Sequence, residues 1–161
     1  MDKFVISVLV ENKFGVLARI AGLFSARGFN IDSLAVGETE DPTVSRMTIV
    51  VEADERILEQ IKKQLNKLID VISVQDLTGG EYVGRELILI KVKVPNAKTR
   101  ENVIKVVDSI GAEIVDAGKK CLTIEESGDE HQINALIELL RPYGIAEIVR
   151  TGKIALQADQ R

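Results

Sequence analysis

The residues best suited to bind a ligand surround a glycine near the start of the chain. Gly15 follows a polar turn and precedes an amphipathic stretch that predicts a helix as far as Arg27. A glycine at the start of a helix leaves the first backbone N–H groups uncovered at the positive end of the helix dipole. Such an end accepts a small anion, for example a phosphate or an amino-acid carboxylate. Asn12 and Asn30, on either side, add neutral donors and acceptors for the rest of the ligand.

The same residues also allow a purely structural interpretation. Residues 12–15 form an ordinary tight turn if Asn12 only supports the backbone. The second asparagine favours a binding role, because Asn30 opens a predicted strand where a β-branched residue would fit better. Gly15 and Gly28 match neither a dinucleotide-binding nor a P-loop spacing. The pattern therefore indicates recognition of a ligand and not chemistry on it.

Candidate catalytic residues are few. The chain has one histidine, His131, and one cysteine, Cys121. His131 follows a predicted helix cap on the polar side of the helix, which is typical of a solvated residue. Cys121 lies in a predicted strand beside apolar residues, so we interpret it as a packed thiol. We therefore expect no nucleophile–base pair, no metal site and no internal disulfide.

Composition limits the classes of partner. The 161 residues are 45% hydrophobic and 29% charged, which predicts a folded protein of one or two small domains. A net charge of −4 and the absence of tryptophan argue against binding to nucleic acid or to an anionic membrane. No apolar stretch approaches the roughly 20 residues of a membrane span, and the N-terminus lacks a signal-peptide pattern. We expect a cytoplasmic protein.

The first half of the chain predicts a βαββαβ unit, from alternating and helical apolar periodicities. The expected strands are 3–11, 29–36, a segment containing Met47, Ile49 and Val51, and 71–77. The first helix is expected over 15–27. Asp54 is the expected N-cap of the second helix.

The same order restarts in the second half. The expected strands are 87–94, 113–117, 120–125 and 145–151, and the expected helices are 99–110 and the one capped by Asp129. The break around Gly79 and Gly80 divides the chain into domain 1–78, linker 79–86 and domain 87–161. The fold class is therefore α+β, with two ferredoxin-like βαββαβ sandwiches in tandem.

Each predicted sheet leaves its edges and one face uncovered. In the first strand that face carries Val5, Ser7 and Leu9, which are too apolar for full exposure. Pairing of sheets or edges between two chains would cover it. We therefore expect a homodimer or a higher homo-oligomer.

The segments around Gly15 resemble a known family. Residues 5–17 and 22–31 are similar to the ACT domain of the acetohydroxyacid synthase (acetolactate synthase) small subunit, and the similarity continues through 41–49, 58–65 and 68–71. It covers nearly all of the first domain. The second half resembles the family's C-terminal domain by length and pattern, with residues 84–87 as the best local match.

The resemblance implies a non-catalytic regulatory subunit with no cofactor of its own. In this family the small subunit activates a catalytic large subunit, which carries thiamine diphosphate, FAD and Mg²⁺, and makes it sensitive to valine. That enzyme condenses pyruvate with pyruvate or 2-oxobutyrate, the first common step towards valine, leucine and isoleucine. The implied effector site lies between two ACT domains. Its residues are Asn12, Gly15, Val16 and Leu17 of one chain, with Asn30 and Ile31 of a second copy.

The residues by themselves leave two other functions open. One is an amino-acid-responsive regulator of transcription or of another enzyme, against which stand the acidic balance and the lack of a helix-turn-helix pattern. The other is a small enzyme on a ferredoxin-like scaffold, since a fold does not fix a function. The lack of an identifiable nucleophile–base pair argues against it.

Overall fold

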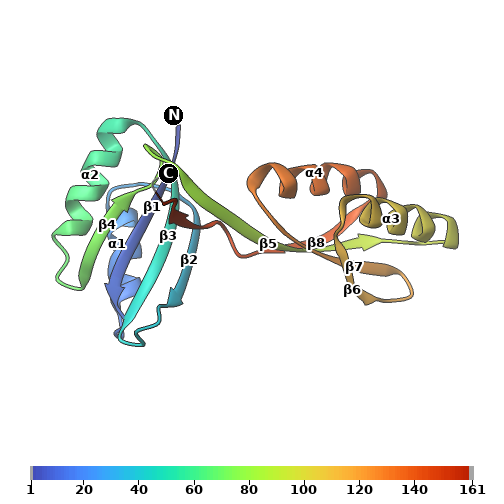
Figure 1. Cartoon of the computed structure of the whole chain (residues 1–161), viewed down its shortest axis with the longest axis horizontal. Coiled ribbons are helices and arrows are strands. Elements are labelled where there is room, and N and C mark those ends of the chain that lie inside the picture. Colours follow the sequence, from blue (N-terminus) through green and yellow to red (C-terminus); the bar gives the residue numbers. More distant parts are fainter. Residues whose placement is uncertain (1, 160–161) are drawn as a thin grey trace. The chain divides into compact units, whose positions relative to one another are not determined.

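The computed structural model describes residues 2–159, which form two compact units (Figure 1). One unit contains the described residues up to Gly84 together with those from Gly152 onward, and the other is Arg85–Thr151. Each unit contains the predicted order of strands and helices, βαββαβ. The fold class predicted from the sequence is therefore confirmed.

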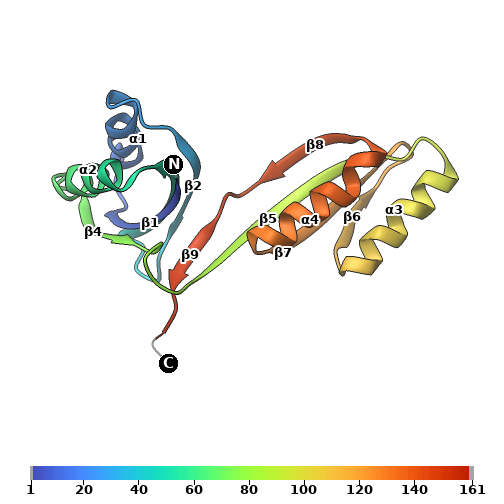
Figure 2. The ribbon, with the colours of Figure 1, turned by 90° about the horizontal axis from the view of Figure 1, so that it is seen from above.

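The first unit is an antiparallel sheet with two helices packed on one face (Figure 2). Its elements are β1 (Asp2–Glu11), α1 (Val16–Ala26), β2 (Ile31–Glu38), β3 (Val44–Ala53), α2 (Glu55–Asn66) and β4 (Val71–Asp76). The strand order is β2-β3-β1-β4, so β2 and β4 are the edges. The core fills the space between helices and sheet, with Ile6, Ile49, Ile20, Phe24 and Ile61 almost inaccessible to solvent.

The two helices of this unit begin differently. The Asp54 carboxylate accepts a hydrogen bond from the N–H of Ile57 at 2.8 Å, so the predicted cap of α2 is confirmed. Helix α1 has Gly15 at its N-cap and no side-chain cap. The start of α1 therefore keeps backbone donors that the start of α2 uses internally.

The second unit repeats this architecture with its own core. Its elements are β5 (Tyr82–Lys93), α3 (Ala97–Ile110), β6 (Glu113–Ala117), β7 (Cys121–Gly128), α4 (Glu130–Leu140) and β8 (Ile145–Arg150). The strands lie in the order β6-β7-β5-β8. Asp129 and Gln132 form a capping box at the start of α4, and Gly111 ends α3 with a φ of 74°. Ile88, Ile90, Val103, Ile124 and Ile133 form the centre of the core.

Two elements differ from the sequence prediction. Strand β5 starts at Tyr82, inside the segment that the pattern assigned to a linker. A ninth strand, β9 (Ile154–Gln157), lies in the segment that the pattern treated as a polar tail and placed with the second domain. Four residues are too few to show a period-2 pattern, and β9 forms by pairing with β5, which is distant in the sequence.

Strand β9 packs on the outer face of the first sheet. Ala155 is buried with Val5, Val50 and Leu77, and its N–H lies 3.4 Å from the hydroxyl oxygen of Thr48. Val5 is 2% exposed as a result. The sequence analysis assigned the cover of this face to a second chain, whereas at Val5 the same chain provides it. The oligomer prediction therefore needs support from elsewhere in the molecule.

Candidate functional site

The turn between β1 and α1 places four of the predicted site residues together. Gly15 has φ 83° and ψ −7°, a left-handed conformation that favours glycine. After it, the N–H of Val16 makes only a 3.4 Å contact with the carbonyl oxygen of Lys13. The N–H groups of Leu17 and Ala18 donate to no acceptor within residues 2–159. The start of α1 therefore presents unused donors at its positive end.

Asn12 lies on the opposite side of this turn. Its amide nitrogen donates to a carboxylate oxygen of Glu38 at 3.1 Å and to the carbonyl oxygen of Pro42 at 2.9 Å. Its backbone N–H donates to the carbonyl oxygen of Thr43 at 2.7 Å. These bonds fix the side chain and leave its amide oxygen as an acceptor for a cationic group.

An ion pair and a hydrogen-bonded carboxylate lie next to the turn. Lys13 pairs with Glu11 at 2.8 Å, and this hydrogen-bonded carboxylate raises the pKa of Lys13. Asp41 accepts from the hydroxyl and the backbone N–H of Thr43, at 2.7 and 2.9 Å, which together lower its pKa. Both pairs lie at the surface, so they shape the turn more than they stabilise the fold.

Two charged residues that the sequence analysis did not identify adjoin Gly15. The Nε and Nη2 atoms of Arg19 lie 2.8 and 2.6 Å from Oδ2 of Asp70. A Cβ atom placed on Gly15 would lie 3.2 Å from Nη1 of Arg19. The only sequence signal was a basic residue one turn after the glycine. Asp70 is 51 residues further along the chain, so the pair forms only in the tertiary structure.

Asn30 and Ile31 lie at the other end of the same sheet. Strand β2 starts at Ile31, paired with Val51, and ends at Glu38, the residue that binds the Asn12 side chain. Seven steps of about 3.3 Å separate Ile31 from Glu38, a distance of roughly 23 Å. A single chain therefore does not bring Asn30 to Gly15.

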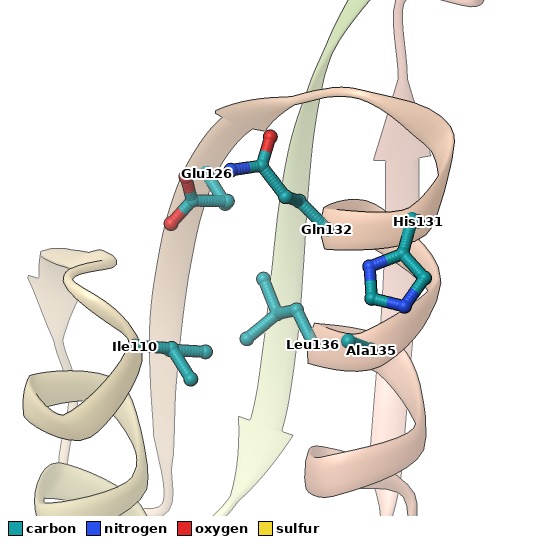
Figure 3. A pocket seen from close by; sticks show the side chains of 6 residues that line it. All are labelled: Ile110, Glu126, His131, Gln132, Ala135 and Leu136. Atoms are coloured by element: carbon teal, nitrogen blue, oxygen red, sulfur yellow. The ribbon is translucent and has the colours of Figure 1, made fainter.

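A hollow lies in the other unit, between α3, β7 and α4 (Figure 3). Its volume is about 260 Å³, and it is lined by Ile110, Glu126, His131, Gln132, Ala135 and Leu136. The Gln132 amide oxygen already accepts a hydrogen bond from the Asp129 N–H in the capping box. Its polar side chains are those of Glu126, His131 and Gln132, and it contains no hydroxyl or thiol.

The single cysteine and the single histidine do not meet. Cys121 is the first residue of β7, and His131 lies in the first turn of the helix that follows this eight-residue strand. The strand places them roughly 20 Å apart or more. Within the described part of the chain, no group of three or more His, Cys, Asp or Glu residues could hold a metal ion. No helix there is long and apolar enough to cross a membrane.

The two units match two family models. Residues 6–73 match the AHAS small subunit-like ACT domain, and residues 85–159 match the small subunit of acetolactate synthase. The chain belongs to the acetolactate synthase small-subunit family. The resemblance found in the sequence is thereby confirmed.

Relatives from distant organisms match this family assignment over nearly the full chain. Proteins described as probable acetolactate synthase small subunits in Methanothermobacter thermautotrophicus and Archaeoglobus fulgidus are 49% and 53% identical to it. The alignments cover 99% and 96% of this chain and 95% and 96% of those proteins. A crystal structure of the acetolactate synthase small subunit from Thermotoga maritima superposes with a TM-score of 0.89 at 36% identity, covering 100% of both chains. This chain therefore shares the two-unit fold of that small subunit.

Proposed function

We propose that the chain is the regulatory subunit of acetolactate synthase, which binds and activates the catalytic large subunit and makes it sensitive to valine. The observation that carries this proposal is the match to small subunits at about half identity over 96–99% of the chain. In this assignment the subunit works in the cytoplasm and has no catalytic activity of its own. Thiamine diphosphate, FAD and Mg²⁺ belong to the large subunit.

The effector site of this proposal is the turn at Gly15. The valine carboxylate binds the N–H groups at the start of α1, including that of Leu17, where the helix dipole favours an anion. The amide oxygen of Asn12 accepts from the valine ammonium group. Asn30 and the Ile31 backbone complete the site from a second copy, and the apolar neighbourhood of Val16 receives the branched side chain. The unused donors of Leu17 and Ala18 support this arrangement.

Strand β2 supports the shared site and the homodimer that it requires. It is an edge of its sheet, so one side of its backbone has no partner strand within the described residues. A two-fold axis that pairs β2 with β2 in antiparallel fashion places Ile31 of one copy beside Glu38 of the other. This pairing brings Asn30 of one copy to the Asn12 turn of its partner. The 23 Å separation within one chain then becomes a reason for dimerisation.

Reconstitution with the large subunit tests the proposal. We expect the large subunit alone to form acetolactate from pyruvate slowly and the purified chain alone to form none. The mixture should form acetolactate faster than the large subunit alone, and valine should inhibit it. The control is the large subunit mixed with an unrelated protein of equal mass. Acetolactate formation by the isolated chain, or a large subunit that does not respond to it, would contradict the assignment.

A further inference from the structure

We infer that Arg19, held in place by Asp70, binds the carboxylate of the effector and makes the site prefer a free amino acid over its neutral amide. This inference rests on the proposed effector site at Gly15. It adds Arg19 to that site, a residue that the pattern of glycine and asparagines in the sequence does not reveal.

The geometry places the guanidinium directly above the turn. Nε and Nη2 of Arg19 are used by Asp70, at 2.8 and 2.6 Å. The third nitrogen, Nη1, donates to no acceptor among the described residues and lies 3.2 Å from the position of a Cβ on Gly15. The left-handed backbone favours glycine here, and any side chain would also push the end of the Arg19 side chain away by a few tenths of an ångström. Nη1 therefore lies beside the glycine that opens α1, and the N–H groups of Leu17 and Ala18 in the first turn of that helix are also unused.

Asp70 holds the guanidinium in a rigid position. Its side chain is only 13% exposed, and its backbone carbonyl oxygen accepts from the N–H of Glu11 at 2.9 Å, which ties it to the end of β1. A guanidinium fixed in this way loses little rotamer freedom when it binds a ligand. The pair is preorganised before the effector arrives.

The electrostatics explain why a carboxylate is preferred. A cation beside the N-terminus of a helix is in an unfavourable position, because the helix end is itself positive. Asp70 compensates for this charge on one side, while the side facing Gly15 stays positive. A carboxylate there interacts with both the helix end and Arg19, and charge-assisted hydrogen bonds of this kind are about twice as strong as neutral ones. A carboxamide oxygen can also accept from the guanidinium, but it has no negative charge, so it gains less from Arg19 and from the helix end.

The alternative is that Arg19 is only a structural brace between α1 and the loop before β4. The two roles differ in their effect on ligands. If Arg19 is only a brace, its loss loosens the turn and lowers the affinity for every ligand by a similar factor. Loss of a carboxylate-binding residue weakens valine and spares valinamide, which has the same side chain and ammonium group but no negative charge.

The test is calorimetric titration of the full chain with valine and with valinamide. The variants are Arg19→Gln and Arg19→Lys, and the matched control is Arg27→Gln, which removes the same charge at the other end of α1. We expect Arg19→Gln to weaken valine binding at least tenfold and to change valinamide binding less than twofold. Arg19→Lys should lose part of the preference for valine over valinamide, because an ammonium group keeps the charge but lacks the planar set of donors of a guanidinium. Arg27→Gln should bind both ligands like the parent.

Each other outcome is decisive. An unchanged ratio of valine to valinamide affinity in Arg19→Gln overturns the inference and leaves the proposed function intact. If circular dichroism shows that Arg19→Gln does not fold, an unchanged ratio in folded Arg19→Lys has the same meaning. A parent chain that binds no valine overturns the effector site, and the role of Arg19 with it.

Discussion

Two features of the structure favour a residue without a side chain at Gly15. Its φ of 83° lies in the left-handed region, and Arg19 occupies the space next to its α-carbon. A side chain there strains the backbone and also enters the space over the start of α1. Because Gly15 is the N-cap and not a helical residue, an aspartate at this position does not benefit from the tolerance of acidic residues in a first helical turn.

Gly15→Asp is expected to remove valine binding and to destabilise the protein. The new carboxylate lies where the proposed site binds the effector carboxylate, next to Arg19, so affinity should fall a hundredfold or more, equivalent to about 3 kcal/mol. The left-handed backbone should cost about 1–2 kcal/mol of unfolding free energy. Calorimetry and urea denaturation measure the two effects.

Gly111→Asp is the matched control for this substitution. Gly111 has a similar φ of 74° and open space around it, but it lies in the second unit. The Gly111→Asp variant should lose a similar amount of unfolding free energy through backbone strain and should bind valine like the parent. If Gly15→Asp binds valine like the parent, the effector site is elsewhere.

Asp41 provides a pH-dependent test of the turn next to Asn12. Hydrogen bonds from the hydroxyl and N–H of Thr43 lower its pKa in the folded protein. A lowered folded-state pKa favours folding above the unfolded-state pKa, and this contribution is lost as the pH falls through the folded-state pKa. Thr43→Val removes the hydroxyl, so we expect the pKa of Asp41 to rise toward its ordinary value of 3.8. NMR titration of the Asp41 carboxyl carbon measures it; identical values in both proteins would show that the hydroxyl is not responsible.

At the scale of elements, β9 acts as a cover for the outer face of the first sheet. Ala155 is the contact residue, packed on Val5, Val50 and Leu77, while its neighbour Leu156 is 58% exposed. A short C-terminal strand thus protects apolar residues of β1 and β3 from water.

Ala155→Asp is expected to lower the free energy of unfolding by about 2–3 kcal/mol, because it places a charge without a partner on an apolar surface. Leu156→Asp adds the same charge to the exposed side of the same strand and should change stability by less than about 0.5 kcal/mol. Urea denaturation of both variants gives the comparison. Equal stability of the two variants would mean that β9 does not pack on the sheet in solution.

At the scale of the whole molecule, the position of Asn30 and Asn12 at opposite ends of β2 makes the proposed site a property of the dimer. Each dimer then has two sites, each with Asn12, Gly15 and their neighbours from one copy and Asn30 and Ile31 from the other. Ligand binding and dimer geometry become coupled in such an arrangement. A regulator needs this coupling.

Mixing two defective variants tests the shared site. Gly15→Asp and Asn30→Ala each damage both sites of their own homodimer, although Asn30→Ala acts more weakly because it removes one partner and adds no charge. A mixed dimer has one site with both defects and one intact site, so random exchange should restore about a quarter of the tight valine sites. Calorimetric stoichiometry after subunit exchange measures this fraction.

The control mixture combines Gly15→Asp with Asn12→Ala. Both residues belong to the same half of the site, so every site in the mixed dimer keeps one defect and no tight sites should return. Recovery in neither mixture would mean that one chain forms the whole site or that no dimer of this kind exists.

The class and order of the elements could be predicted from the sequence, because they depend on local signals. Apolar periodicity marked the main strands and helices, and Asp54, Asp129 and Gly111 marked helix ends that the structure has at the same residues. The segments around Gly15 also indicated the family to which the chain belongs, and they predict a binding turn.

Tertiary structure decided the features that join distant parts of the chain. The Arg19–Asp70 pair spans 51 residues, and β9 pairs with β5 while its Ala155 packs on the apolar face of the first sheet. The separation of Asn30 from Gly15 follows from the direction of β2 within the sheet. Local patterns contain no information on such contacts, since each depends on two segments that meet only after folding.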